Sequence, residues 1–312
     1  MGPGRRRGAS PETEPDSAEQ APRVVDRRLL IALSTLFALA AFAANSVLCR
    51  LALGGRAIDA SSFALIRLGS GAVVLWLIRS ASRKRSGAGR GWVPPAMLFL
   101  YAAAFSFAYL SLSAGTGALI LFGSVQATMI LAALRSGERF RRLEVAGLVL
   151  ALAGLAYLVS PGLSSPSPVG SALMVAAGAA WGVYSIRGRA SVDPLGDTAR
   201  NFLGAVPLAV GVSLLARGSA HVTPAGAWLA VTSGGLASGL GYVVWYAALG
   251  GLTAIRAAMV QLTVPVLAAF GGVVFLGEHV SLRLVLSAAL ILGGVGVAVT
   301  GRARSLRLVR RT

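Results

Sequence analysis

The sequence is poor in the residues that form reactive centres. It has 312 residues, of which one is cysteine and two are histidine, and only 13% are charged. Cys49 by itself excludes an internal disulfide and a cysteine-based metal site, and its apolar surroundings predict a small buried side chain. His221 and His279 lie too far apart in the sequence to suggest a histidine metal centre. We therefore expect neither a metal nor a cofactor.

The shortage of charge also limits the class of fold. Soluble domains contain about 25% charged residues, whereas hydrophobic residues here reach 55% and glycine contributes 39 positions. A soluble protein of this length could not bury so much apolar surface. Intrinsic disorder is excluded for the same reason, except at the two ends of the chain.

Long hydrophobic runs follow one another along most of the chain. A helix needs roughly 20 apolar residues to cross about 30 Å of hydrocarbon. Ten runs near this length lie at residues 29–49, 59–79, 92–113, 115–134, 144–160, 168–187, 197–216, 226–249, 252–276 and 283–300. Helices are expected because a backbone in lipid must satisfy its own hydrogen bonds. The predicted fold class is an all-α integral membrane protein with ten transmembrane helices, between a disordered N-terminal tail (1–28) and a basic C-terminal tail (301–312).

The net charge of +18 predicts an orientation in the membrane. If the N-terminus is cytoplasmic and the spans alternate, 23 of the 29 cations lie in cytoplasmic segments and four lie on the opposite side. A bias of this kind sets membrane topology, and the cytoplasmic cations would face anionic lipid. We expect a multi-pass protein of the cell inner membrane with both termini cytoplasmic, and no nucleic-acid partner.

The two halves of the chain share a pattern. Gly137-Glu138 closes the fourth run and Gly277-Glu278 closes the ninth, and a glycine follows each glutamate by sixteen positions, at Gly154 and Gly294. The halves 29–160 and 168–300 then hold five spans each. An odd number of spans gives the copies opposite orientations, as in the inverted repeats of secondary transporters. Such a repeat predicts a substrate site near the middle of the membrane.

Short stretches follow one another in a specific order: Ala44-Asn45-Ser46, Ser62-Phe63-Ala64-Leu65-Ile66-Arg67, Ala180-Trp181-Gly182-Val183-Tyr184, the run 242–249, the run from Arg256 to Pro265, and Leu276-Gly277-Glu278. Through these stretches the chain resembles, over residues 29–300, the EamA-type members of the drug/metabolite transporter superfamily. The resemblance implies a ten-helix fold, an inverted repeat and the movement of small metabolites. Family members often carry proline thirteen residues before both closing glutamates. Pro265 fits this pattern, but Val125 stands at the first position and is followed by Gln126.

Ionisable side chains inside the predicted spans are candidates for function. Arg67 and Arg256 would bind an anionic substrate if they face a cavity, or would anchor their helices by reaching the membrane surface. Asp59, Glu138 and Glu278 lie at span ends, which argues against a proton antiporter built on a central carboxylate. The two glutamates are expected to cap helix junctions.

Polar and aromatic residues complete the candidate site. Amides in spans join helices or contact substrate, and aromatic rings form either an interfacial belt or a cavity wall. Tyr242, Trp245 and Tyr246 share one helix face, for which both interpretations stay open. The predicted substrate-binding residues are Asn45, Arg67, Gln126, Trp181, Tyr184, Tyr242, Arg256 and Gln261, with Pro265 as a hinge.

These observations predict a secondary transporter, an exporter of small organic metabolites or drugs that works by alternating access. No Ser/His/Asp or Cys/His set stands in helical register, so we do not expect an enzyme. A membrane-embedded lipid-processing enzyme is the alternative, but it would need paired acids, histidine or a metal. A non-transporting membrane sensor would need a sizeable soluble domain. A monomer and a homodimer are both compatible with the sequence.

Overall fold

The computed structural model describes residues 21–81, 91–136, 142–160, 162, 165–188, 191–252, 257 and 260–309. Throughout these residues the regular structure is helical, apart from an isolated bridge between Ile58 and Val222. The predicted all-α class is confirmed. The helices are α1 (Ala21–Gly54), α2 (Ala60–Ala81), α3 (Val93–Ala108), α4 (Ala114–Arg135), α5 (Arg142–Val159), α6 (Pro168–Gly188), α7 (Pro194–Leu215), η1 (Arg217–Ser219), α8 (Pro224–Val231), η2 (Thr232–Leu240), α9 (Gly241–Leu249), α11 (Val264–Leu276) and α12 (Leu282–Val309).

Several helices begin where a polar side chain caps their first turn. Asp193 accepts a hydrogen bond from the Gly196 backbone N–H, and Pro194 occupies the first turn of α7. Thr223 does the same for α8, which opens with Pro224. Proline fits this position because the first N–H groups of a helix have no partner within it.

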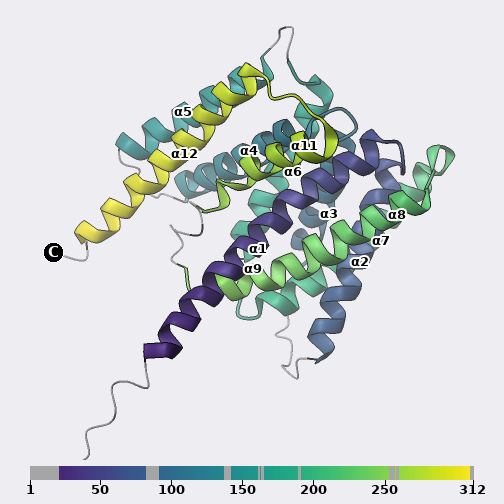
Figure 1. The fold of residues 1–312 in the computed structure, drawn as a ribbon, viewed down its shortest axis with the longest axis horizontal. Coiled ribbons are helices and arrows are strands. Elements are labelled where there is room, and N and C mark those ends of the chain that lie inside the picture. Colours follow the sequence, from purple (N-terminus) through teal and green to yellow (C-terminus); the bar gives the residue numbers. More distant parts are fainter. Residues whose placement is uncertain are drawn as a thin grey trace, which may run out of the picture.

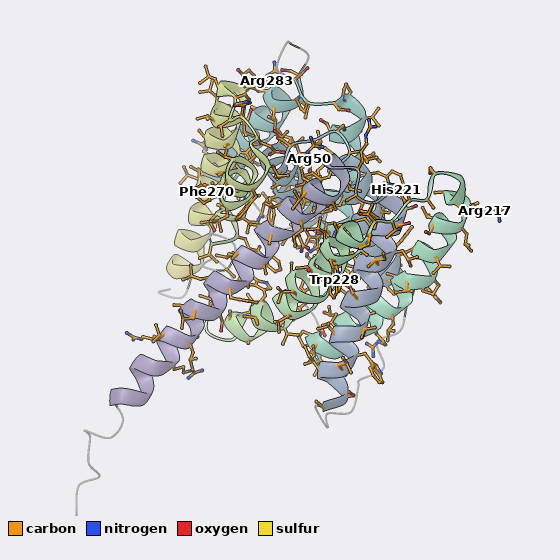
Figure 2. All side chains as sticks on the ribbon, turned by 45° about the vertical axis from the view of Figure 1, so that its right-hand side comes forward. Arg50, Arg217, His221, Trp228, Phe270 and Arg283 are labelled. Atoms are coloured by element: carbon orange, nitrogen blue, oxygen red, sulfur yellow. The ribbon has the colours of Figure 1, made fainter. Side chains whose placement is uncertain are left out.

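Six helical segments are long and apolar enough to cross a membrane: Arg27–Gly54, Ala60–Ala81, Ala114–Ala132, Pro168–Gly188, Pro194–Leu215 and Pro224–Leu249. Four shorter apolar helices accompany them: Val93–Ala108, Val145–Val159, Val264–Leu276 and Leu282–Ala298. These segments fall on the ten predicted runs, while the number that cross the membrane stays a prediction. Large apolar side chains face outward, as Figure 2 shows for Trp228 and Phe270, which are 69% and 66% exposed. Lipid is the solvent that such a surface requires.

Two helices extend beyond the predicted spans. Helix α1 begins at Ala21, within the predicted N-terminal tail (1–28). Helix α12 continues to Val309, within the predicted basic C-terminal tail (301–312), and the two tail assignments stay predictions. Helical backbone satisfies its own hydrogen bonds, so a helix can continue beyond the apolar run that anchors it. Residues 1–20 and 310–312 lie outside the described part.

The helices form a bundle in which sequence-distant segments pack together (Figure 1). Helices α5 and α12 lie side by side at one edge, and α1 runs diagonally across the bundle. The main contacts are α5 with α12, α2 with α7, α4 with α11, α3 and α4 with α6, α1 with α9 and α11, α2 with η2, and α3 with α7. At the α5–α12 contact Gly147 and Gly294 meet backbone of the opposite helix. Side chains at these glycines would separate the two helices.

The segment η2 is a nine-residue π-helix that joins α8 and α9 into one continuous rod. Its sequence is rich in glycine and serine, and Gly235 and Gly239 pack closely against Val74 of α2. A π-helical stretch inside an α-helix is rare and is frequently found at functional sites. The π-helix η2 therefore makes the middle of this rod a candidate functional region.

Candidate functional site

A cavity of about 850 Å³ lies inside the bundle. Its lining includes Gly188 and Gly250, at the C-terminal ends of α6 and α9, and Gly91 and Ser191, just before α3 and α7. The cavity therefore reaches the end of the bundle where these four helix termini lie. This is the end that the arginine distribution predicts to be cytoplasmic. The volume falls within the range of about 300–1,000 Å³ that is typical of small-molecule sites.

Aromatic rings form the inner walls and the floor of the cavity. Seven line it: Phe42, Phe122, Trp181, Tyr184, Tyr242, Trp245 and Tyr246. The ring of Phe42 lies 5.7 Å from that of Tyr242 and 5.9 Å from that of Trp245. Trp181 lies 5.5 Å from Phe122. Such a surface can hold an apolar or aromatic body by packing, or a cation by cation–π attraction.

Neutral polar groups are set into the aromatic wall. Gln126 and Gln261 line the cavity, and Asn201 donates a hydrogen bond to the Tyr184 hydroxyl at 3.4 Å. The Thr198 hydroxyl donates to that of Tyr246 at 3.3 Å. Polar groups of this kind orient a bound molecule in a mainly apolar site.

Charged groups gather near the mouth of the cavity. Arg200 forms an ion pair with Asp197, and the Ser191 hydroxyl donates to the same carboxylate at 2.5 Å. Arg187 is exposed and also lines the cavity. The other described lining residues are uncharged and carry aromatic, aliphatic, amide or hydroxyl groups.

Five of the eight predicted site residues line this cavity: Gln126, Trp181, Tyr184, Tyr242 and Gln261. Arg256 lies outside the described residues. Pro265, predicted as a hinge within a span, instead lies in the first turn of α11. There it interrupts no helical hydrogen bond, so any hinge action would occur at the junction before α11.

Asn45 and Arg67 lie behind the cavity rather than in it. Asn45 Oδ1 accepts a hydrogen bond from the Ser233 hydroxyl of η2 at 2.8 Å. Arg67 is 3% exposed, and its Nη2 donates to the Tyr101 hydroxyl at 2.8 Å. In this conformation Arg67 reaches neither the cavity wall nor the surface of the bundle, and its role in substrate binding stays a prediction. The ring of Tyr101 covers it and lies 5.1 Å from that of Trp181.

Polar contacts join helix ends at the end of the bundle opposite the cavity mouth, which we call the closed end. Glu278, after α11, accepts hydrogen bonds from the Ala114 backbone N–H at 2.8 and 3.1 Å and pairs with Arg50 at 3.4 Å. Arg50 also donates to the carbonyl oxygen of Tyr109 at 3.1 Å. The expectation that Glu278 caps a helix junction is confirmed, because Ala114 is the first residue of α4.

A second polar contact joins the loops at this end. Asp59 accepts hydrogen bonds from the Ser61 hydroxyl at 2.5 Å and from the backbone N–H groups of Ser62 and His221, each at 3.0 Å. Partial burial raises the pKa of this carboxyl, but the hydrogen bonds outweigh it and lower the pKa to about 2. Figure 2 shows Arg50, His221 and Arg283 toward the end of the bundle away from the start of α1.

Sequence reasoning missed several of the residues that build the site. Phe42, Phe122 and Tyr101 carried no signal, because an apolar span gives no preference between a lipid-facing and an inward ring. Trp245 and Tyr246 were recognised as one helix face, and the structure selects the cavity wall over the interfacial belt. Within the described residues no group of three or more His, Cys, Asp or Glu side chains could hold a metal ion.

The fold and the cavity define a class: helical membrane proteins that enclose a site of small-molecule size between their helices. Residues 168–300 match the model of the EamA-like transporter family. The protein PA1977 of Pseudomonas aeruginosa, named as uncharacterized, is 49% identical over 278 residues, which are 89% of this chain and 96% of that protein. The chain belongs to the EamA-like transporter family, and the resemblance noted from its sequence is confirmed.

Two further similarities agree with this assignment. A Salmonella typhimurium protein named "Probable amino-acid metabolite efflux pump" is 29% identical over 203 residues, covering 60% of this chain and 68% of that protein. A solved crystal structure matches with a TM-score of 0.60 at 23% identity, over 85% of this chain and 97% of the other. At this identity the likeness concerns the fold alone.

Proposed function

We propose that this membrane transporter exports small organic molecules by alternating access, and that the structure is its inward-facing state. The observation that carries the proposal is a cavity that reaches one end of the bundle and stops at an aromatic floor. The opposite end is held shut by the Arg50–Glu278 pair and by the Asp59 contacts. A substrate could enter from one side only, which alternating access requires of each end state.

The contacts between helices support two inverted halves, residues 29–160 and 168–300. Exchanging the halves maps α1 to α6, α2 to α7, α3 to the α8–η2–α9 rod, α4 to α11 and α5 to α12. The contacts α5–α12, α2–α7 and α4–α11 then map onto themselves. The contacts of α6 with α3 and α4 map onto those of α1 with α9 and α11. The family model covers the same residues as the second half.

Export is favoured by the orientation and by one relative. The mouth lies at the end that carries 23 of the 29 cations when the N-terminus is cytoplasmic, so the substrate would load from the cytoplasm of a bacterial cell. The Salmonella relative is named as an efflux pump. The aromatic walls and neutral amides suit a molecule with an apolar or aromatic body and a few polar groups.

Flux measurements in proteoliposomes test this proposal. Purified protein is reconstituted and assayed with a radiolabelled panel of amino acids, aromatic acids, neutral aromatic compounds and organic cations. We expect saturable flux of at least one compound, and competition by related compounds. Trp181→Ala should lower that flux at least tenfold, whereas Trp228→Ala, on the lipid-facing surface, should leave it within about twofold. Folded protein with no flux across the whole panel would contradict the proposal.

A further inference from the structure

A buried polar layer lies directly behind the floor of the cavity. It consists of Asn45 of α1, Arg67 of α2, Tyr101 of α3, and Ser233 and Ser238 of η2, which are linked by hydrogen bonds. None of the five lines the cavity. Four packed segments therefore bring polar groups together in the apolar interior of the protein.

Arg67 carries the charge of this layer without a carboxylate partner among the described residues. Its Nη2 donates to the Tyr101 hydroxyl at 2.8 Å and its Nε to the Ser238 hydroxyl at 3.4 Å. Its guanidinium carbon lies 5.1 Å and 4.7 Å from the ring centres of Tyr101 and Phe105. In the part of the chain that the structure describes, Nη1 has no hydrogen-bond partner. A buried guanidinium with a free N–H group is costly unless something pairs with it.

One layer of side chains separates this guanidinium from the cavity. Tyr101 holds Arg67 through its hydroxyl, and its ring lies 5.1 Å from that of Trp181, which lines the cavity. Arg67 is seven residues from the start of α2 at the closed end, or about 10 Å of helix. A molecule that leaves the cavity toward the closed end must therefore pass the level of Arg67.

We propose that Arg67 binds a carboxylate group of the transported molecule once the contact between Tyr101 and the floor residue Trp181 has opened. The free Nη1 and the adjacent Nη2 would form the two parallel hydrogen bonds that a guanidinium makes to a carboxylate. The carboxylate would replace the Tyr101 hydroxyl on Nη2 and neutralise the buried charge. The inference rests on the proposed transport function and narrows its substrates to organic acids and zwitterions that carry a carboxylate.

The competing interpretation is a purely structural arginine. The rings of Tyr101 and Phe105 would then stabilise the cation, and the residue would only hold α2, α3 and η2 together. Removing it would weaken the fold and lower the transport of every compound to the same degree. A selective effect on carboxylates separates the two interpretations.

The test uses pairs of compounds that differ only in this group. Benzoate and benzamide, phenylacetate and phenylacetamide, and indole-3-acetate and indole-3-acetamide are assayed as mutual competitors in proteoliposomes at pH 7.5. We expect the wild type to prefer the acid of a transported pair by about tenfold or more. Arg67→Gln should reduce that preference to about twofold or less while amide flux persists. The preference of Arg67→Lys should lie between those of the wild type and Arg67→Gln.

Two further variants complete the design. Tyr101→Phe keeps the ring and leaves Nη2 free, so the preference for acids should persist. Arg217→Gln makes the same chemical change at an exposed position outside the cavity and should behave as wild type. Circular dichroism and size-exclusion chromatography establish that each variant is folded.

The opposing outcomes are distinct. Equal handling of acid and amide by the wild type, an unchanged preference in Arg67→Gln, or flux of cationic and neutral compounds alone would overturn the carboxylate site and leave the transport proposal standing. Chloride stimulation of amide flux that is lost in Arg67→Gln would assign the site to an inorganic anion, and would also overturn it. Absence of flux for the broad panel would instead contradict the transport proposal itself.

Discussion

Phe42 shows what a single residue contributes to this site. Its ring, on α1, contacts Trp181 of α6 and both Tyr242 and Trp245 of α9, and so it joins rings from two other helices into one floor. Residues of this kind define where the cavity ends. Their position depends on edge-to-face contacts between rings, which contribute about 0.5–1.5 kcal/mol each beyond their buried area.

The first prediction concerns the stability of this floor. Trp181→Ala removes a buried ring that contacts Phe42, Tyr101 and Phe122. We expect a loss of about 3–5 kcal/mol in the free energy of unfolding, typical of large-to-small changes at buried aromatic sites. Thermal unfolding in detergent, followed by circular dichroism, measures the corresponding fall in Tm. Trp228→Ala is the matched control because that ring is 69% exposed, and an equal loss in both variants would refute the prediction.

At this scale the sequence singled out amide, tryptophan and tyrosine residues of the cavity but not its phenylalanines. Gln126 and Gln261 stood out because an amide in an apolar run is unusual, and both line the cavity. Phe42 and Phe122 could not be singled out, since lipid and protein interior are equally apolar and leave no hydrophobic periodicity to interpret. The burial of Arg67 depends on Tyr101 of another helix, a contact that no local pattern contains.

At the scale of helices, the closed end depends on a few contacts between helix termini. The pair between Arg50 and Glu278 joins the last turns of α1 to the second residue after α11, and Ala114 adds the start of α4. Both side chains keep some exposure, at 27% and 16%. An ion pair in this setting is of moderate strength, which suits a contact that would break during the proposed alternating access.

The second prediction is that weakening this contact opens that end. Glu278→Gln removes the charge that Arg50 faces and leaves one carbonyl oxygen for the Ala114 N–H. The single cysteine, Cys49, is fully buried next to Arg50 and serves as a native reporter. We expect at least a severalfold faster reaction of Cys49 with a membrane-impermeant maleimide. Arg217→Gln, which alters charge at the same end, should label at the wild-type rate, and equally slow labelling of Glu278→Gln would count against the gate.

The third prediction follows from Asp59, which joins the α1–α2 loop to the segment before α8. Because the folded-state pKa is lowered from 3.8 to about 2, the ionised carboxyl stabilises the fold above pH 4. That contribution is lost as the pH falls through 2. Tm measured in detergent should therefore be higher for wild type than for Asp59→Asn at pH 7, and the difference should shrink between pH 4 and pH 2. A difference that is independent of pH would exclude this role.

Helix positions were largely predictable, but their ends and irregularities were not. The predicted span 168–187 differs by one residue from α6, because Pro168 and the polar segments around the helix mark its limits. The start of α1 was missed by eight residues, since nothing in a polar tail distinguishes helix from coil. The π-helix η2 escaped prediction because its wide turn depends on close packing against α2.

At the scale of the whole molecule, the arginine distribution and the helix packing both concern the orientation of the protein in the membrane. Arg50, Arg217 and Arg283 lie near the closed end, as Figure 2 shows. The Arg79–Asp193 pair at 2.9 Å lies at the end that bears the cavity mouth. The loops that hold these arginines therefore lie at opposite ends of the bundle, as alternating spans require, and the end that faces the cytoplasm stays a prediction.

The fourth prediction tests this orientation. A fluorescent protein fused after Thr312 should fold and fluoresce, whereas alkaline phosphatase fused there should be inactive, because the C-terminus is expected in the cytoplasm. Insertion of either reporter after Ser219, between α7 and α8, should give the opposite pattern. Phosphatase activity at the C-terminal fusion would reverse the orientation, and with it the proposed direction of transport.

The π-helix η2 makes the cavity sensitive to chain length at a place outside its walls. Each residue added to or removed from an α-helix turns the remainder of that helix by about 100°. If residues 232–240 formed an ordinary α-helix with the same number of residues, Tyr242, Trp245 and Tyr246 would be rotated relative to α1 and α7. The wide turn therefore fixes the direction in which three cavity-lining rings face, although none of residues 232–240 lines the cavity. A comparison of lining residues alone would overlook this contribution.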